Sequence, residues 1–455
     1  MLGQLSNATD KKEVNVKTHA SRIFILIFLL CGWPCFASAD AVTDWNENAG
    51  EAAKAAGFSP DNNPLHESRM YAMVHVAIHD ALNAIDRHSR PYVFDSQVPS
   101  GASPDAAVAA AAHDVLVTLI NQNPSIFPPE CIAAGLASVE ADYTTALGAI
   151  ADGQAKTQGV AVGQDAAAAI LALRADDGSD TLLIDAAYPQ GTAPGEWRFT
   201  PGFPFAFAPD WAEVTPFVLK EAAQFRPGPP YKLTSRKYAA DVNEVQRLGV
   251  KTGSTRTADQ TQIALFWVES SPLAWNRITR TVSAAAGLDL WENARLFGLL
   301  NLAMADGYVG TFEAKYLYNF WRPVTAIQLA DTDDNPDTTA DLAWEPLVPT
   351  PPVPDYDSGH GVEGGAAAQV LKRFFKDDEV SFSACSLSTP LPAEERCGGT
   401  SEVRRAYSSF TQAAEENGVS RIYNGFHFRD AVRKGIKHGR KIGNRAVNLF
   451  LKPVE

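Results

Sequence analysis

Apolar side chains recur at spacings of three and four residues along most of this chain, and no other feature constrains its fold as strongly. Such spacing places the apolar residues on one face of an α-helix. Strict alternation of apolar and polar residues, which would predict strands, forms no runs in this sequence. The sequence therefore predicts an all-α fold, and the helical pattern covers residues 65–87, 104–122, 129–150, 155–175, 235–249, 257–268, 272–287, 290–315, 400–417 and 430–451.

Length and composition are those of a large folded protein. The chain has 455 residues, of which 45% are hydrophobic and 20% are charged, a balance typical of globular domains. Its formal net charge of -14 argues against a general nucleic-acid binder, because such a protein needs basic surface to neutralise phosphates. We therefore expect no nucleic-acid partner.

The first 39 residues resemble an export signal. Basic residues between positions 11 and 22 precede the apolar run 23–36, and the small residues 37–39 fit a cleavage site. The run is shorter than the ~20 residues that a membrane-spanning helix needs, so a membrane anchor is the less favoured alternative. We expect a secreted or periplasmic protein without stable membrane insertion.

Export to an oxidising compartment gives the cysteines after the signal a structural role. Cys385 and Cys397 flank a polar segment that contains prolines, so a disulfide that closes a surface loop is plausible. Such a bridge would stabilise the fold by roughly 2–3 kcal/mol, mainly by restricting the unfolded chain. Cys131 is expected to be a small buried hydrophobic residue.

The pattern Arg-x7-Ala-x2-Asp occurs twice within apolar helical segments, ending once at Asp80 and once at Asp306. Chance similarity between two amphipathic helices is one explanation, and two similar bundles packed together is the other. On the second interpretation, an N-terminal helical region spans 40–288 and a C-terminal catalytic bundle spans 289–455, within one integrated fold. The Gly-, Pro- and aromatic-rich segment 176–216 is too apolar for a free linker, so we expect a long connection packed over the helices.

Side chains suited to binding a tetrahedral oxyanion are concentrated after residue 300. Lys315, Arg322 and Arg421 supply three positive charges, and guanidinium groups match such anions well. Ser358 and Gly359 precede a Gly/Ala-rich helical segment. The free N–H groups and the dipole at a helix N-terminus favour a bound anion. These residues predict an oxyanion site.

Two histidines add reactive groups to this predicted site. His360 stands at the start of the helical segment, where it could donate or accept a proton. His427 could act as a nucleophile or a metal ligand through one ring nitrogen. Alone, His427 would more often be a structural histidine, but the ordered combination of cations, helix start and histidines is far more specific. Such a set suits transfer at a pentavalent centre.

These motifs resemble the signature of a known superfamily. Lys-x6-Arg-Pro (315–323), Ser-Gly-His (358–360) and Ser-Arg-x5-His (420–427) resemble the vanadium-dependent haloperoxidase and type 2 phosphatidic acid phosphatase superfamily. Segments 224–230 and 292–323 are similar to those of secreted bacterial haloperoxidase-like members. The resemblance implies an all-helical fold built around four-helix bundles, with the active site in the C-terminal bundle.

The resemblance also implies a role for each motif residue. His427 would bond to the vanadium of a vanadate cofactor, or would attack phosphorus to give a phosphohistidine. His360 would be the general acid–base. In a peroxidase, hydrogen peroxide would replace vanadate oxygens and halide would attack the bound peroxide. The oxygens of vanadate or phosphate would be held by Lys315, Arg322, Ser358, Gly359 and Arg421.

Three functions are consistent with this resemblance. Chain length favours a haloperoxidase-like enzyme that oxidises halide with hydrogen peroxide, since soluble phosphatases of the superfamily are shorter and its lipid phosphatases carry membrane helices. Val353 favours the alternative, an acid phosphatase acting on phosphate monoesters, because related haloperoxidases often have an aromatic residue or histidine there for the halide. A non-catalytic oxyanion-binding protein is the third, and retention of both histidines and all three cations argues against it.

Besides Val353, two positions depart from the superfamily pattern. Asp357 precedes Ser358 where the family usually has proline, and it would add negative charge beside the anion site. Asp430 follows His427 by three residues, whereas the family's aspartate follows by four. An orienting role for Asp430 is therefore doubtful.

Overall fold

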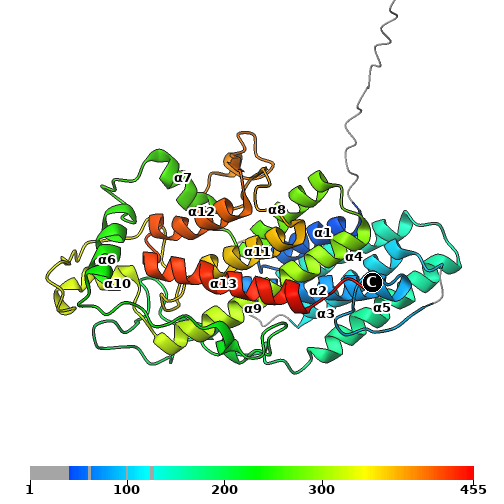
Figure 1. Ribbon diagram of the computed structural model, residues 1–455, viewed down its shortest axis with the longest axis horizontal. Coiled ribbons are helices and arrows are strands. Elements are labelled where there is room, and N and C mark those ends of the chain that lie inside the picture. The colour runs from blue at the N-terminus through cyan, green and yellow to red at the C-terminus, as the bar shows by residue number, and fades with distance from the viewer. Residues whose placement is uncertain (1–39, 60–62, 99–100, 123–127, 455) are drawn as a thin grey trace, which may run out of the picture. The chain divides into compact units, whose positions relative to one another are not determined.

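The computed structural model describes residues 40–59, 63–98, 101–122 and 128–454. The predicted export signal, 1–39, lies outside the described residues. Over the described part the chain is mainly helical (Figure 1), which confirms the predicted all-α class. None of the helices there combines the length and the apolar character that crossing a bilayer requires.

The helices fall into two sequence groups separated by a long irregular stretch. The first group contains α1 (Ala41–Ala55), α2 (Pro64–Ile85), α3 (Pro104–Asn121), α4 (Pro129–Gly148) and α5 (Gln154–Leu173). The second contains α6 (Arg236–Leu248), α7 (Ala258–Phe266), α8 (Ser271–Ala286), α9 (Leu290–Tyr318), α10 (Pro323–Gln328), α11 (Gly359–Phe375), α12 (Phe410–Tyr423) and α13 (Arg429–Leu449).

Short strands and 3-10 turns occupy the connections. The strands form two antiparallel pairs, β1 (Ile184–Asp185) with β2 (Ala206–Phe207) and β3 (Phe382–Ala384) with β4 (Arg405–Tyr407). The 3-10 turns are η1 (Trp211–Glu213), η2 (Ala222–Phe225), η3 (Ala330–Thr332) and η4 (Ala393–Glu395).

The helix predicted at 400–417 was wrong at its start. Residues 405–407 are strand β4, and α12 begins only at Phe410. The side chain of Ser409 accepts a hydrogen bond from the N–H of Gln412 and so caps the helix there. Helix α1 was not predicted. Its start is fixed by a capping box between Asp40 and Thr43.

Helix α9 is central to the packing, since it contacts α2, α11 and α13 (Figure 1). Helices α11 and α13 pack closely because glycines line their interface. A Cβ atom added at Gly435 would lie 2.6 Å from the carbonyl oxygen of Ser358, and one added at Gly439 would overlap the carbonyl oxygen of Val362. The glycine stripe of α13 therefore sets the position of the N-terminus of α11.

The repeated Arg-x7-Ala-x2-Asp pattern has a structural counterpart. Buried Asp80 on α2 accepts hydrogen bonds from the backbone N–H groups of three consecutive residues, 92–94, at 2.7 to 2.9 Å. Buried Asp306 on α9 does the same for residues 217–219, at 2.6 to 2.7 Å. The two aspartates thus hold a chain segment against their helices in the same way.

The long connection is packed against the helices, as expected. Trp197 and Trp211 are almost fully buried. The N–H of Trp197 donates to the carbonyl oxygen of Asn319 at 2.8 Å, and the N–H of Trp321 donates to that of Gly195 at 2.9 Å. These bonds fix the chain between the end of α9 and Arg322. Lys315, in the last turn of α9, and Arg322 are two of the predicted site residues.

The predicted disulfide is present between Cys385 and Cys397. Cys131, in contrast, is only half-buried, so its prediction as a buried residue was wrong. Helix α4, which carries Cys131, buries only Gly135 and Val139 fully, because one side of α4 is covered and the other is exposed.

Candidate functional site

Lys315 lies in the last turn of α9, and its side chain is buried, with 2% of its surface exposed. Its ammonium group donates hydrogen bonds to the carbonyl oxygens of Pro354 at 2.9 Å and of Asp355 at 3.1 Å. The charge of the lysine is therefore placed beside the segment that leads into α11.

Arg322 stands at the start of α10 and is 1% exposed. Its Nε donates to the carbonyl oxygen of Val353 at 2.7 Å, and its Nη1 donates to that of Phe426 at 2.8 Å. These bonds connect the segment before α11 with the segment before α13. Nη1 also lies 3.1 Å from Nε2 of His427, so the two predicted site residues are in direct contact.

Arg421 projects from the last turn of α12 and is 3% exposed. Its Nη1 donates to the carbonyl oxygen of Trp267 at 2.8 Å. Its guanidinium carbon lies 4.6 Å from the ring centroid of Phe426, within the range of a cation–π contact. Both contacts hold the third cation in a fixed position.

Ser358 is the N-cap of α11 and is fully buried. Its N–H donates to the carbonyl oxygen of Ala431 at 3.2 Å, which ties the helix start to α13. A Cβ atom added at Gly359 would meet nothing within 4 Å, so open space adjoins the first residue of the helix. The free N–H groups of a helix N-terminus and this space suit an anion.

His360 follows directly on α11. Its Nε2 lies 3.2 Å from the carbonyl oxygen of Glu269, which can only accept, so Nε2 carries the proton of this contact. The pKa of His360 is held well below its usual value by burial and then by the charge of Arg421, while the carbonyls of Glu269 and Trp267 oppose this shift. His360 is therefore a neutral imidazole near Arg421.

His427 is 5% exposed and lies between α12 and α13. Its Nδ1 lies 2.8 Å from Oδ1 of Asp355. Because the guanidinium of Arg322 beside Nε2 can only donate, the ring proton is assigned to Nδ1, which donates to Asp355. That bond leaves Nε2 with a lone pair, which a metal ligand or a nucleophile requires. Burial is the largest cause that keeps the pKa of His427 well below its usual value, followed by the charges of Arg322 and Lys315.

The electrostatic effects show that the predicted residues form one cluster. Burial lowers the pKa of Lys315 well below its usual value, and the charge of Arg322 lowers it further. The charge of Arg421 acts on Lys315 and on both histidines. The structure thus brings together all seven motif residues: Lys315, Arg322, Ser358, Gly359, His360, Arg421 and His427.

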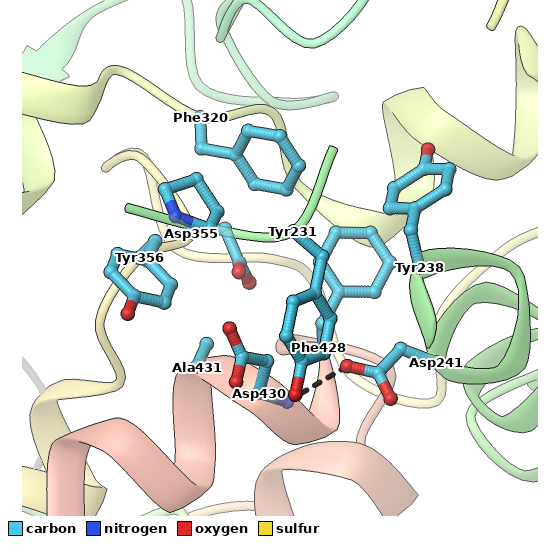
Figure 2. Close-up of a pocket in the computed structure, with 10 residues that line it drawn as sticks. Tyr231, Tyr238, Asp241, Phe320, Asp355, Tyr356, Phe428, Asp430 and Ala431 are labelled. Carbon is cyan, nitrogen blue, oxygen red and sulfur yellow. Dashed lines mark hydrogen bonds between the residues drawn. The ribbon is translucent and has the colours of Figure 1, made fainter. Parts of the chain in front are cut away.

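Asp355 is the residue of the site that the sequence did not reveal. It is fully buried, and burial raises its pKa to about 7 although the charges of Arg322 and Lys315 oppose the shift. Figure 2 shows its carboxylate directed into a small pocket that the carboxylate of Asp430 also faces. Asp355, and not Asp430, contacts the ring of His427.

Asp430 has other partners. Its N–H donates to the carboxylate of Asp241 at 2.8 Å, as Figure 2 shows, and its carboxylate lies 3.8 Å from Nζ of Lys434. The doubt about an orienting role for Asp430 was therefore justified. No motif spacing pointed to Asp355, because it precedes the Ser-Gly-His motif and lies far from His427 in sequence.

The carboxylate of Asp357 is bound on the side of α9 and α13. Its Oδ1 accepts a hydrogen bond from the hydroxyl of Thr311 at 2.8 Å, and its Oδ2 lies 3.0 Å from Nδ1 of His438. Both Asp357 and His438 are buried. The acidic departure from the family pattern therefore has polar partners of its own and ties the N-terminus of α11 to its neighbours.

The donor set fits a tetrahedral oxyanion such as vanadate or phosphate. Three buried cations, a helix N-terminus with open space beside it and an imidazole nitrogen with a lone pair converge here. In the described ranges, no group of three or more His, Cys, Asp or Glu side chains could hold a bare metal ion.

Comparisons with known proteins identify chains that are similar to this one. Residues 295–455 match the family model described as the VCPO second helical-bundle domain. A vanadium chloroperoxidase from Curvularia inaequalis is 24% identical over 480 residues, which cover 81% of this chain and 75% of the relative. The matched residues 295–455 include all seven motif positions.

Solved structures extend the likeness over most of the chain. A bacterial vanadium-dependent iodoperoxidase has a TM-score of 0.72 and 25% identity, covering 91% of this chain and 97% of its own. A holo-type bacterial vanadium-dependent chloroperoxidase has a TM-score of 0.68 and 18% identity, covering 90% and 97%. The resemblance predicted from the motifs is confirmed.

Proposed function

We propose that this chain, which resembles the vanadium-dependent haloperoxidases in sequence and in fold, binds vanadate and oxidises halide with hydrogen peroxide. One observation carries the proposal: the imidazole of His427 stands among three buried cations, with Asp355 on its Nδ1. The comparisons support a haloperoxidase-type enzyme, and the roles of the individual residues are our inference.

The cations would hold the oxyanion and neutralise its charge. Lys315, Arg322 and Arg421 are buried, so their charges act with little screening by solvent. The N–H groups at the start of α11 would bind an oxygen, since Ser358 and Gly359 place them next to open space. A guanidinium that approaches a peroxide oxygen would also favour charge developing there.

His427 would bind the vanadium through Nε2, with Asp355 as the positioning residue. A carboxylate on Nδ1 fixes the tautomer and the ring orientation and makes the other nitrogen a better ligand. Bound vanadate would supply the Lewis acid that activates hydrogen peroxide toward halide. The protein residues would hold the oxyanion in place and limit the access of water to it.

His360 would move the protons of the reaction. Its depressed pKa keeps it neutral, so it can accept a proton from hydrogen peroxide and return it to the departing oxygen. Its Nε2 contact with the carbonyl of Glu269 fixes the ring. Nearby Arg421 disfavours a long-lived imidazolium, so the accepted proton would be passed on quickly.

An acid phosphatase remains the second candidate, and Val353 is the observation that favours it. Val353 is buried in an apolar cluster with Phe312 and Tyr308, so position 353 itself offers halide neither a cation nor a ring. The same cations and His427 would bind a phosphate monoester, with a phosphohistidine as intermediate and His360 protonating the leaving alcohol. A non-catalytic oxyanion-binding protein is the third candidate.

We place the enzyme outside the cytoplasm, secreted or periplasmic. Two features support this location: the signal-like sequence of residues 1–39 and the disulfide between Cys385 and Cys397. Disulfides persist in oxidising compartments and are rare in the cytosol.

One preparation tests the proposal against its main alternative. The vanadate-loaded protein is expected to brominate a phenolic dye in the presence of hydrogen peroxide, and the vanadate-free protein is not. The same sample is assayed for hydrolysis of a phosphate monoester. Ester hydrolysis without bromination would establish the phosphatase, and vanadate binding with neither reaction would establish the non-catalytic protein.

A further inference from the structure

Glu363 carries an ionisable carboxyl group into the protein interior next to the site, and none of the roles above uses it. It lies three residues after His360 on α11 and is 0% exposed. In the part of the chain that the structure describes, neither of its carboxyl oxygens has a hydrogen-bond partner. A buried carboxylate without partners is very unfavourable, whereas the neutral acid is tolerated.

The fold makes room for this carboxyl group. Oε1 of Glu363 lies directly over Gly307 of α9, where a Cβ atom would overlap it. Burial raises the pKa of Glu363 well above its usual value, in agreement with a neutral acid at the α9–α11 interface. An unneeded carboxyl group would be replaced at little cost by an apolar side chain, which removes the burial penalty.

Two buried hydroxyl groups near Glu363 and the start of α8, those of Tyr308 and Ser271, have no hydrogen-bond partner among the described residues. The pKa of Tyr308 is raised well above its usual value by burial first, and then by the negative charges of Glu363 and Glu67. Ser271 at the start of α8 opposes this shift through a side-chain contact. Tyr308 is therefore close to both Glu363 and Ser271.

The same region of α8 borders His360. The carbonyl oxygen of Glu269, two residues before Ser271, accepts from Nε2 of His360 at 3.2 Å. Residues three apart on a helix are also neighbours, with Cβ atoms ~5–6 Å apart, so Glu363 and His360 adjoin along α11. A proton could pass between them directly or across the hydroxyls of Tyr308 and Ser271 with an internal water.

We infer that Glu363 is a proton-relay residue that returns a proton to His360 during turnover. The inference rests on the proposed function. Oxidation of one halide ion by one hydrogen peroxide gives hypohalous acid and water, and it consumes one proton. A buried site that consumes protons needs an internal donor, and Glu363 is an uncompensated acid beside the general acid–base.

The transfer balances in protons and charge. The proton that His360 accepts at Nδ1 from hydrogen peroxide passes to the departing oxygen, which needs a second proton to leave as water. The O–H bond of Glu363 then breaks as an N–H bond forms at Nδ1 of His360, and His360 passes on this second proton, the one consumed in each turnover. The resulting carboxylate takes a proton from hydronium in solvent water. Arg421, whose charge acts on Tyr308 beside Glu363, would stabilise the carboxylate while it lasts.

Titratable groups on neighbouring helices surround the relay. His438 of α13 faces α9 at Gly310, one turn after Gly307, and Glu67 of α2 is bound by the hydroxyls of Ser59 and Ser270. The groups to be considered in any pH dependence are Glu67, Tyr308, His360, Arg421 and His438.

Two variants test the relay. Glu363→Gln keeps the shape without a transferable acid proton, and Glu363→Met keeps the volume without polarity. We expect both to bind vanadate within about twofold of the wild type and to lose at least about tenfold in kcat at neutral pH, with KM nearly unchanged. Wild-type kcat in the Gln variant would overturn the relay, whereas a wild-type enzyme that oxidises no halide would overturn the proposed function itself.

A stability measurement tests the buried acid without any activity assay. The pKa of Glu363 in the folded protein lies above its unfolded value of 4.5. The stability that its neutral carboxyl group contributes is therefore complete below about pH 4.5 and is lost as the pH rises through the folded pKa. The ratio of wild-type to Glu363→Gln unfolding constants should rise by up to about tenfold per pH unit above pH 4.5. A ratio that stays flat up to pH 7 would show that Glu363 is ionised and would overturn the inference.

Discussion

Oδ1 of Asp355 lies 2.8 Å from Nδ1 of His427, although 72 residues separate them in sequence. The contact joins the segment before α11 to the segment before α13, and it fixes which nitrogen of the imidazole is free. The same region positions Lys315, whose ammonium group donates to the carbonyl of Asp355 at 3.1 Å. Asp355 therefore positions both the His427 ring, through Nδ1, and the ammonium group of Lys315.

Replacement of Asp355 tests its positioning role. Asp355→Ala removes the acceptor on Nδ1, so the ring loses its fixed tautomer, and we expect vanadate affinity to fall about 10- to 100-fold. Asp430→Ala is the matched control, because Asp430 lies in the same pocket but does not contact His427. Affinities measured by isothermal titration calorimetry decide the question. Equal losses in both variants would mean that the pocket, and not the Nδ1 contact, matters.

His360→Ala should separate chemistry from binding. If His360 transfers protons, its loss lowers kcat by about 100- to 10,000-fold, while vanadate affinity changes much less. Steady-state bromination and calorimetry on the same sample give the two numbers. His88→Ala serves as control, because His88 has an exposed side chain stacked on Trp291 and should change neither. Parallel losses in kcat and affinity would assign His360 to anion binding.

The α11–α13 interface should not tolerate a methyl group. In Gly439→Ala the new Cβ overlaps the carbonyl oxygen of Val362, so the helices must separate, and we expect a loss of about 1–3 kcal/mol in the free energy of unfolding. Gly148→Ala, with nothing within 4 Å of the added atom, should be neutral or stabilising. Urea titrations measure both. Equal stability of the two variants would contradict the close packing.

Buried His75 predicts acid sensitivity. Its pKa is lowered to about 3 by burial and then by Arg280, so the stability that it contributes is complete above the unfolded value of 6.5. That stability is lost as pH falls from 6.5 toward 3, by up to about tenfold in the unfolding constant per pH unit. His75→Gln should show a shallower decline between these values. Denaturation series at fixed ionic strength test this, and identical slopes would refute it.

Local patterns predicted most helices because burial of one helix face repeats every three to four residues. Strand β4 was taken for helix because its pairing with β3 is a contact between distant segments. Helix α1 was missed because it follows directly on the signal-like residues.

The residues of the site also fall into those that local sequence patterns predict and those that depend on distant contacts. The motif residues could be predicted because spacing within each motif reflects local geometry, such as the helix start at Ser358. Asp355 could not be predicted, since its contact with His427 depends on how two distant segments meet. The pairing of Asp357 with His438, 81 residues apart, has no local signal either.

Vanadate binding to the purified wild type and to His427→Ala tests the central claim most directly. Calorimetry should give close to one vanadate per chain for the wild type and no measurable binding for the variant, because the variant lacks the nitrogen that would bond to vanadium. Circular dichroism should show that the variant keeps its fold. An unchanged vanadate affinity in a folded His427→Ala variant would contradict the account, since the anion would then be held without His427.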